Sequence, residues 1–93
     1  MENIKKGMNE FYIGDSSEQA VARITFKPIG ENTIAIDHTI VSEALQGRGI
    51  AKQLLQKMAD YAREENLKIV PVCSYAKTVM TRGADYTDVL AQE

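Results

Sequence analysis

The sequence predicts an α+β domain in which a three-stranded antiparallel meander precedes a parallel strand–helix–strand unit of α/β type. Residues 19–27 alternate between apolar and polar side chains, which is typical of a half-buried antiparallel strand. Apolar residues then recur at helical spacing from Ile50 to Tyr61, and a short apolar run follows at residues 69–73. A helix between two strands indicates a parallel pair with a right-handed crossover. One or two short helices are expected after it, and we treat residues 1–93 as a single domain.

The composition excludes several classes of protein. It is 44% hydrophobic and 26% charged, as in ordinary globular domains, and the net charge of −2 provides no basic field for nucleic acid. No apolar run approaches the ~20 residues of a membrane span, and the first residues lack the apolar segment of a secretory signal. A single cysteine forms no internal disulfide. We therefore expect a cytoplasmic protein without a nucleic-acid or membrane partner.

Turn-forming residues divide the first half of the chain into strands. Residues 10–13 form a short strand candidate, and the turns at 14–17 and 28–32 separate it from strands at 19–27 and 33–41. Residues 1–9 are either loose or paired as an edge strand. Strict alternation in the third strand places Ile34, Ile36, His38 and Ile40 on one face.

The second half of the chain reads as helix, strand and helix. Asn66 is expected to end the long helix in a left-handed conformation. Pro71 lacks an N–H, so residues 69–73 form either an edge strand or a strand that parts from its neighbour. Ser74 is expected to cap a helix over residues 75–82 that ends at Gly83. A last short helix is expected from Ala84, with Tyr86, Val89 and Leu90 packed inward.

The segment Gln-Gly-Arg-Gly-Ile-Ala, residues 46–51, joins the third strand to the long helix. The first N–H groups of a helix have no intrahelical partner, and the helix dipole adds positive charge there, so this turn predicts a phosphate site. Gly47 and Gly49 permit a close approach and positive φ, and Arg48 offers a charged contact. The alternative is an ordinary turn whose glycines serve local geometry only.

The spacing Gln-x-x-Gly-x-Ala resembles the pyrophosphate-binding signature of the GNAT acyltransferase superfamily, which cradles coenzyme A. Residues 70–77, which contain Pro-x-Cys-Ser-Tyr, resemble a compact single-domain branch of that superfamily, and residues 84–90 are also similar to it. The resemblance runs from about residue 34 to residue 90. It implies two parallel strands splayed around acyl-CoA, and it favours the parted strand for residues 69–73.

The resemblance further implies acetyl transfer from acetyl-CoA to an amine. It implies that the backbone at Ile40 and Val41 pairs with pantetheine. It assigns cofactor binding to Ile40, Val41, Gln46, Gly47, Arg48, Gly49, Ile50, Ala51, Lys52, Cys73 and Ser74. The resemblance assigns catalysis to Cys73 and Tyr75. Either the Cys73 thiolate takes the acetyl group, or an amine attacks the thioester directly while Cys73 or water acts as base and Tyr75 as acid.

The residues themselves leave alternatives open. Cys73 lies between a strand and a helix N-terminus, where a thiol is reactive, but a lone cysteine after an apolar run also fits a small core residue. His38 is expected to be a hydrogen-bonded structural histidine rather than a base, and Glu43 a solvated loop residue. Tyr75 also fits a packed aromatic. No metal-ligand spacing occurs, so no metal is expected.

Three hypotheses of function follow. The first is an acetyl-CoA-dependent N-acetyltransferase, the second a CoA or acyl-CoA-binding module without turnover, and the third a small interaction protein. Larger GNAT enzymes carry helices between their first strands, where this chain has only the turns at 14–17 and 28–32. With few elements to enclose the acceptor, the resemblance implies a bulky acceptor such as a protein amine, or an acceptor site that a partner completes.

Overall fold

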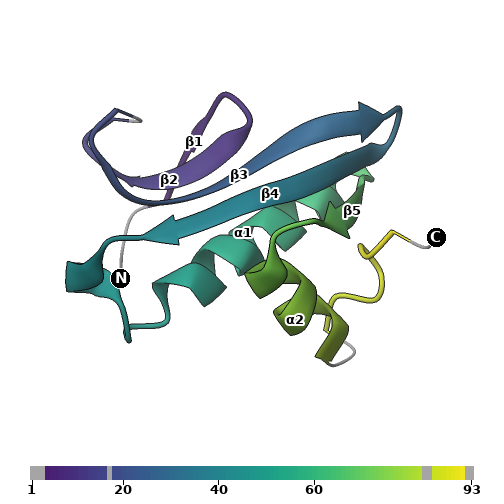
Figure 1. The fold of residues 1–93 in the computed structure, drawn as a ribbon. Coiled ribbons are helices and arrows are strands. Elements are labelled where there is room, and N and C mark those ends of the chain that lie inside the picture. The colour runs from purple at the N-terminus through teal and green to yellow at the C-terminus, as the bar shows by residue number, and fades with distance from the viewer. Residues whose placement is uncertain (1–3, 17, 83–84, 92–93) are drawn as a thin grey trace.

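The computed structural model describes residues 4–16, 18–82 and 85–91, and these form a mixed five-stranded sheet covered by helices (Figure 1). Along the chain the elements are β1 (Lys5–Gly7), β2 (Glu10–Gly14), β3 (Ala20–Gly30), β4 (Thr33–Val41), the 3-10 helix η1 (Glu43–Leu45), α1 (Ile50–Glu65), β5 (Lys68–Pro71) and α2 (Ser74–Arg82). The strand order in the sheet is β1-β2-β3-β4-β5. Only β4 and β5 run parallel. The α+β class with a parallel strand–helix–strand unit is therefore confirmed.

The antiparallel part has four strands rather than the three that the sequence predicted. β1 pairs with β2 through the register Gly7↔Glu10, so the edge-strand alternative for the first residues is the one that holds. β3 continues through Pro28 to Gly30, which pairs with Thr33, so the predicted turn at 28–32 shrinks to residues 31–32. Pro28 is tolerated because strands accept proline where no ladder bond needs its N–H.

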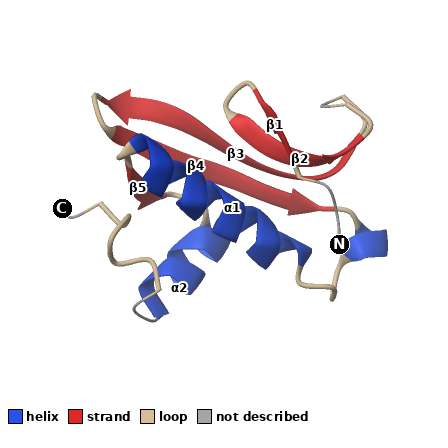
Figure 2. Cartoon of the chain, turned by 180° about the vertical axis from the view of Figure 1, so that it is seen from behind, coloured by secondary structure: helices blue, strands red, loops and turns tan. Residues whose placement is uncertain are grey.

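One face of the sheet carries the core, and Figure 2 shows α1 and α2 together on that side of the strands. The buried residues of α1 match the predicted stripe and are Ile50, Leu54, Leu55, Met58, Ala59 and Ala62. Sheet residues that pack against them are Phe11, Ile13, Ala22, Ile24, Phe26, Ile34, Ile36 and Ile69. Asn66 ends α1 with φ 57°, so the predicted left-handed cap is confirmed.

A β-bulge at Asp37 changes which side chains of β4 face the core. Phe26 pairs with Ile36 but Thr25 pairs with His38, so Asp37 is an extra residue in β4. Beyond it, Thr39 lies opposite the buried Ile24, and His38 moves to the outer face. The prediction that His38 and Ile40 share a face with Ile34 was therefore wrong. His38 is exposed, so it does not pack on the core face where a structural histidine was expected.

β4 and β5 part after four paired residues. Their register ends at Ile36↔Pro71, and the N–H groups of Val72 and Cys73 both donate to the carbonyl of Ile36, at 3.0 and 2.9 Å. Figure 1 shows β4 continuing beyond the end of β5 towards η1. Pro71 therefore stands where the ladder stops, and β5 is also the last strand of the sheet, so both the parted-strand and the edge-strand alternatives describe it. Val72 and Cys73 lie outside β5, although the sequence predicted a strand over residues 69–73.

The C-terminal segment differs from its prediction. Residues 85–89 form turns instead of a short helix, and Leu90 makes an isolated parallel bridge with Ile69. Tyr86 and Val89 are nevertheless buried, 5% and 1% exposed, so the expected inward packing of these two side chains is correct. The predicted helix end Gly83 and helix start Ala84 lie outside the described residues, as does Ser17 of the first turn.

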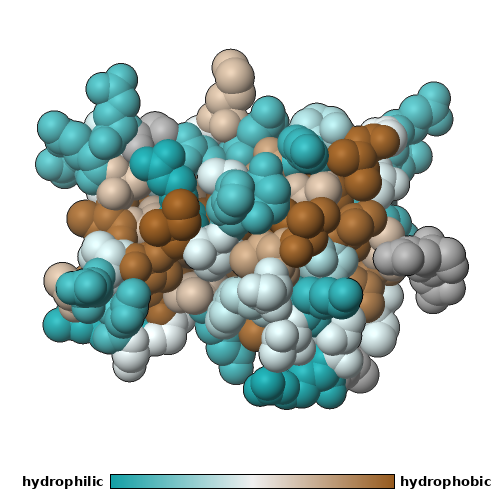
Figure 3. Space-filling model, viewed as in Figure 1, coloured by the Kyte–Doolittle hydropathy of each residue, from teal (hydrophilic) through white to brown (hydrophobic). Residues whose placement is uncertain are grey.

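Exposed apolar side chains are scattered. Figure 3 shows hydrophobic residues as separate patches between polar ones, and the large exposed hydrophobics include Val21, Ile40 and Val72. Single exposed hydrophobics of this kind are normal for folded proteins. Within the described ranges, no helix has the length and apolar character needed to cross a membrane.

Candidate functional site

The loop before α1 depends on two glycines with left-handed backbone. Gly47 has φ 83° and Gly49, the N-cap of α1, has φ 72°. A Cβ built on either glycine meets no atom within 4 Å, so backbone conformation rather than crowding requires glycine here. The same openness leaves the outer side of the loop free for a ligand.

A row of backbone donors follows from this geometry. The first helical hydrogen bond runs from Gln53 N to Gly49 O at 3.1 Å. No backbone carbonyl in the described part of the chain accepts from the N–H groups of residues 47–52. All of these residues except Arg48 line a pocket of about 150 Å³, whose walls are Val41, Leu45, Gln46, Gly47, Gly49, Ile50, Ala51, Lys52 and Tyr75. Such a row at a helix N-terminus suits a phosphate group.

The end of β4 is fixed to this loop. Gln46 Nε2 donates to Val41 O at 3.3 Å, so this side chain holds the loop before α1 against the end of β4. Ser42 N donates to Val21 O, so these two residues form a hydrogen-bonded pair between β3 and the residue after β4. Directly opposed residues of antiparallel strands alternate between hydrogen-bonded and non-hydrogen-bonded pairs. Arg23↔Ile40 is then a bonded pair, so the backbone of Ile40 faces β3. The backbone groups of Thr39 and Val41 face the gap that β5 leaves.

Cys73 lies where that gap meets the start of α2. Its carbonyl accepts from Lys77 N at 2.9 Å, which makes Cys73, not the predicted Ser74, the N-cap residue. The side chain is half-buried at the edge of the core, and its Sγ lies 3.6 Å from Thr39 Oγ1. The sulfur is therefore neither sealed in the core nor fully exposed.

The surroundings of Cys73 favour its thiolate. Burial raises the pKa of the thiol, but hydrogen bonds from the Ala76 N–H, the Thr39 hydroxyl and the Tyr75 N–H outweigh it, and the net pKa lies below its ordinary value. A helix N-terminus that lowers the pKa of a thiol is a usual environment of reactive cysteines. Of the two alternatives for Cys73, this environment favours the reactive one.

Tyr75 is a residue of α2 that also borders the loop before α1. It lines the loop pocket, and burial raises its pKa, with further increases from negative charge on Tyr86 and Cys73. The phenol therefore stays protonated near neutral pH and can donate a proton or a hydrogen bond.

Other predicted residues stand apart from the pocket. Ser74 and Arg48 are exposed and absent from its walls, and Glu43 is a solvated residue of η1 as expected. Among the described residues, no group of three or more His, Cys, Asp or Glu is placed to hold a metal.

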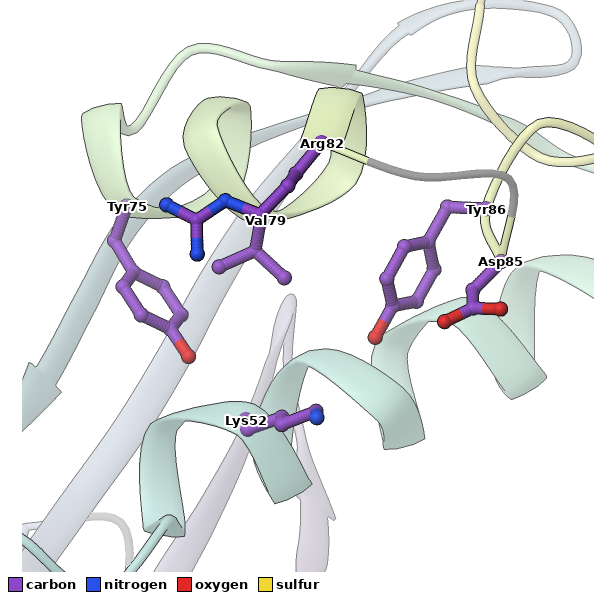
Figure 4. A pocket seen from close by; sticks show the side chains of 6 residues that line it. All are labelled: Lys52, Tyr75, Val79, Arg82, Asp85 and Tyr86. Carbon is purple, nitrogen blue, oxygen red and sulfur yellow. The ribbon is translucent and has the colours of Figure 1, made fainter.

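Sequence reasoning missed Thr39 and the far end of α2. Thr39 carries no motif, and only the bulge at Asp37 turns it towards Cys73. A second cavity of about 400 Å³ adjoins the loop pocket through their shared walls Lys52 and Tyr75, and Arg82 and Tyr86 line it. The sequence predicted the bounds of α2 but no inward face for it, and nothing in the sequence indicated that α1 lies across from Arg82 (Figure 4).

The family profile described as GCN5-related N-acetyl-transferase matches residues 10–89. The chain belongs to this family. The GNAT sequence signature and the parted strands of the GNAT fold therefore occur together in one chain.

Curated relatives of this GNAT chain share the name Protein NATD1. The Xenopus tropicalis protein is 39% identical over 54 residues, which cover 58% of this chain and 50% of that protein. The Danio rerio protein is 34% identical over 70 residues, 75% of this chain and 64% of that protein. The chain thus spans about half to two thirds of the length of these relatives.

Solved structures of GNAT proteins share the fold. A solution structure of a GCN5-like putative N-acetyltransferase from Staphylococcus aureus has a TM-score of 0.82 and 45% identity, covering 98% of this chain and 89% of that one. An Escherichia coli family member in complex with CoA has a TM-score of 0.55 and 22% identity, with 67% and 38% of the two chains covered. An Elizabethkingia anophelis member with acetyl-CoA bound has a TM-score of 0.59 and 19% identity, with 78% and 50% covered.

Proposed function

We propose that this chain binds acetyl-CoA and transfers its acetyl group to the nitrogen of an amine, with Cys73 beside the thioester. The observation that carries the proposal is the alignment of three features: the row of N–H donors at residues 47–52, the unpaired edge of β4, and a thiol of lowered pKa where β5 ends. Two structural neighbours are complexes with CoA or acetyl-CoA, which supports the choice of donor.

The donor fits along these features in one direction. Its diphosphate lies on the N–H groups that start α1, as anions do at helix N-termini. Its pantetheine amides pair with the free edge of β4 like an added strand. Because the backbone of Ile40 faces β3, we assign this pairing to Thr39 and Val41 and withdraw Ile40 from the predicted set. The thioester then reaches the N-terminus of α2.

In the direct route the amine nitrogen attacks the thioester carbonyl. The C–N bond forms, the C–S bond breaks, the Cys73 thiolate or a water takes the ammonium proton, and Tyr75 protonates the departing CoA thiolate. Backbone N–H groups at the gap stabilise the oxyanion of the tetrahedral intermediate. The raised pKa of Tyr75 keeps its proton available for this step.

In the alternative route Cys73 is the nucleophile. Its thiolate takes the acetyl group from CoA, giving an acetyl-cysteine and free CoA thiol, and the amine then attacks the acetyl-cysteine. The lowered pKa of Cys73 supports both routes, because a thiolate serves as a base and as a nucleophile. A thiol that must stay reduced also supports a cytoplasmic setting.

The acceptor is proposed to be an amine on a bulky molecule, such as a protein. Only short connections join the first strands, and the outer sheet face around the gap leaves Ile40 57% and Val72 62% exposed. No helix among the described residues walls a narrow acceptor pocket on that side. An open approach admits large acceptors.

Mass spectrometry of the intact chain tests the proposal. The wild type is incubated with acetyl-CoA and then with a lysine-containing peptide, beside Cys73→Ser and Cys73→Ala. Peptide acetylation that falls by at least tenfold in both variants supports a role for the thiol. An acetyl adduct on Cys73 that the peptide removes assigns the second route, and turnover without an adduct assigns the first. CoA binding with no turnover on any of a panel of amines overturns the enzyme in favour of a binding module.

A further inference from the structure

The two edges of the sheet differ. The edge at β5 is covered by the C-terminal segment: Ile69 N donates to Val89 O at 2.6 Å, and Ala91 N donates to Ile69 O at 2.8 Å. The edge at β1 is open, because β1 is first in the strand order and β2 is its only partner among the described residues (Figures 1 and 2). An open edge strand presents unpaired backbone donors and acceptors to another chain.

Lys6 directs its backbone away from the sheet at this open edge. Phe26 N donates to Asn9 O at 2.9 Å, so the next residue, Glu10, turns its backbone from β3 towards β1. Its partner Gly7 is therefore hydrogen-bonded to β2, and bonded pairs alternate with non-bonded pairs along an antiparallel ladder. Lys6 belongs to the non-bonded pair that follows. Its N–H and carbonyl thus point outward, where a further strand can pair with them.

A pocket of about 280 Å³ lies between this edge and α1, and we call it the edge pocket. Ile4 and Lys6 line it from the edge, Phe11 lines it from β2, and Tyr61 lines it from α1. The rings of Phe11 and Tyr61 meet edge to face with centroids 5.5 Å apart, and Lys6 Nζ lies 5.3 Å from the Tyr61 centroid. The charged residues that α1 adds to its rim are Lys57, Asp60 and Glu64. The edge pocket therefore combines an aromatic surface with a charged rim.

The open edge is itself positively charged. Lys5 and Lys6 are both exposed, and β1 contains no acidic residue. On the rim of the edge pocket Lys57 adds a further cation, while Asp60 is already ion-paired with Arg63 at 3.1 Å. A second copy that paired with β1 about a two-fold axis at Lys6 would place two lysines directly opposite each other, which is destabilising. The charge therefore disfavours a second copy and favours a strand that carries carboxylates.

We propose that the open edge of β1 binds an extended segment of a partner protein, which adds a strand to the sheet and places an apolar side chain, flanked by carboxylates, at the edge pocket. In an antiparallel pair, the partner residue opposite Lys6 bonds to its N–H and carbonyl, and directly opposed side chains share one face. That side chain therefore points towards Phe11 and Tyr61. The flanking residues lie on the other face, where a carboxylate meets Lys5.

This mode of binding divides the work between backbone and side chains. The main-chain bonds to Lys6 provide affinity, while the edge pocket and the lysines provide specificity. The site is at the edge of the sheet opposite β5, and it shares no lining residue with the loop pocket. Binding of the partner is therefore independent of CoA, and it goes beyond the proposed function.

Three fluorescent peptides test the proposal by anisotropy, with backbone amide NMR to locate the site. The probe is Thr-Thr-Glu-Leu-Glu-Thr-Thr, and its controls replace both Glu by Lys or the Leu by Ser. The wild type is expected to bind the probe about tenfold more tightly than the lysine peptide, because like charges meet in that complex. The serine peptide should also bind about tenfold more weakly, since it leaves the edge pocket unfilled. Amide shifts are expected at Lys6 and Tyr61.

Variants of the chain test the pairing itself. Lys6→Pro removes the outward N–H, and an edge strand tolerates proline where that N–H faces solvent, so the ladder with β2 remains. It is expected to bind the probe about fivefold more weakly, as one lost hydrogen bond predicts. N-methylation of the leucine in the probe removes a bond at the same pair without changing the protein, and should weaken binding equally. Lys77→Glu, an exposed charge reversal on α2, is the control and should bind the probe as the wild type does.

Each outcome decides the proposal, whether or not the chain binds CoA. Tighter binding of the probe, shifted amides at β1, and weakening by Lys6→Pro but not by Lys77→Glu support it. No binding of any peptide at millimolar concentration overturns it, and the lysines then serve only to prevent association. Equal affinity for the acidic and basic peptides, or shifts confined to residues outside β1 and α1, also overturns it. So does a dimer in sedimentation that Lys6→Pro dissociates, because a second copy then occupies the edge.

Discussion

Cys73 Sγ lies 3.6 Å from Thr39 Oγ1, so a thiol at the start of α2 meets a hydroxyl on β4 from 34 positions earlier in the chain. The contact spans the gap where β4 and β5 part. It joins the edge of the strand proposed to bind pantetheine to the group proposed to act on the thioester. The reactivity of Cys73 thus depends on β4 as well as on its own helix.

Replacing Thr39 by Val is expected to make Cys73 less reactive. The variant removes a hydroxyl that donates to the thiolate, so the pKa of the thiol rises from its lowered value towards the ordinary one. A lost hydrogen bond of ~1 kcal/mol predicts alkylation by iodoacetamide about fivefold slower at pH 7. Alkylation rates against pH measure the effect, and Thr39→Ser, which keeps the hydroxyl, is the control. Identical pH profiles for wild type and Thr39→Val would contradict the role of this contact.

Alanine at Gly49 is expected to impair both the fold and CoA binding. Its φ of 72° is strained for any residue with a Cβ, and the strain costs about 1–2 kcal/mol. Relief of that strain displaces the N–H donors that follow. Gly30→Ala is the matched control, because a Cβ there meets Thr33 at an ordinary 3.7 Å. Denaturant unfolding and CoA titration measure the two effects. Wild-type affinity in Gly49→Ala would count against the loop as the diphosphate site.

Thr25→Val is expected to destabilise the bulge in β4. Thr25 Oγ1 donates to Asp37 Oδ1 at 2.5 Å, and this bond, against a smaller effect of burial, lowers the pKa of Asp37. The bond is half-exposed, so we expect a loss of about 1 kcal/mol, or roughly 4–8 °C in Tm. A carboxylate whose pKa is lowered by folding contributes stability above its unfolded pKa and loses it as pH falls through the folded value. The deficit of Thr25→Val should therefore be largest at pH 7 and shrink as acid protonates Asp37, and a deficit that does not change with pH would refute this cause.

Asp88→Asn is expected to loosen the segment that follows α2. Arg63 Nε donates to Asp88 Oδ2 at 2.8 Å, and another guanidinium nitrogen donates to the Asp85 carbonyl at 2.7 Å. The hydrogen bond from Arg63 lowers the pKa of Asp88, so this stabilisation is present above the unfolded pKa of aspartate and is lost as pH falls through the folded value.

Hydrogen exchange of the Ala91 amide reports on this segment, because that N–H donates to Ile69 O at 2.8 Å. Exchange is expected to accelerate in Asp88→Asn at neutral pH, and thermal melts should show a small decrease in Tm. Glu64→Gln on the exposed side of α1 is the control and should match the wild type. Unchanged Ala91 exchange in Asp88→Asn would contradict the role of the Arg63–Asp88 ion pair in holding the segment.

Local patterns predicted most of the elements because their causes are local. Helical spacing found the buried stripe of α1, and Asn66 marked its end. Pro71 marked the point where β5 leaves β4. The last predicted helix failed at residues 85–89, where the chain instead makes turns and bridges Ile69. That bridge depends on β5, and nothing near Leu90 in the sequence reveals it.

The sequence by itself determined the strand–loop–helix order and the glycines that leave a row of N–H donors at the start of α1, because both depend on backbone preferences of neighbouring residues. Only the tertiary structure decided which side chains of β4 face the thiol. Asp37 is an extra residue in β4, because Thr25 and Phe26 on β3 pair with the residues on either side of it. This bulge turns Thr39 inward and His38 outward. A bulge depends on the pairing of distant segments, which alternation along a single strand does not contain.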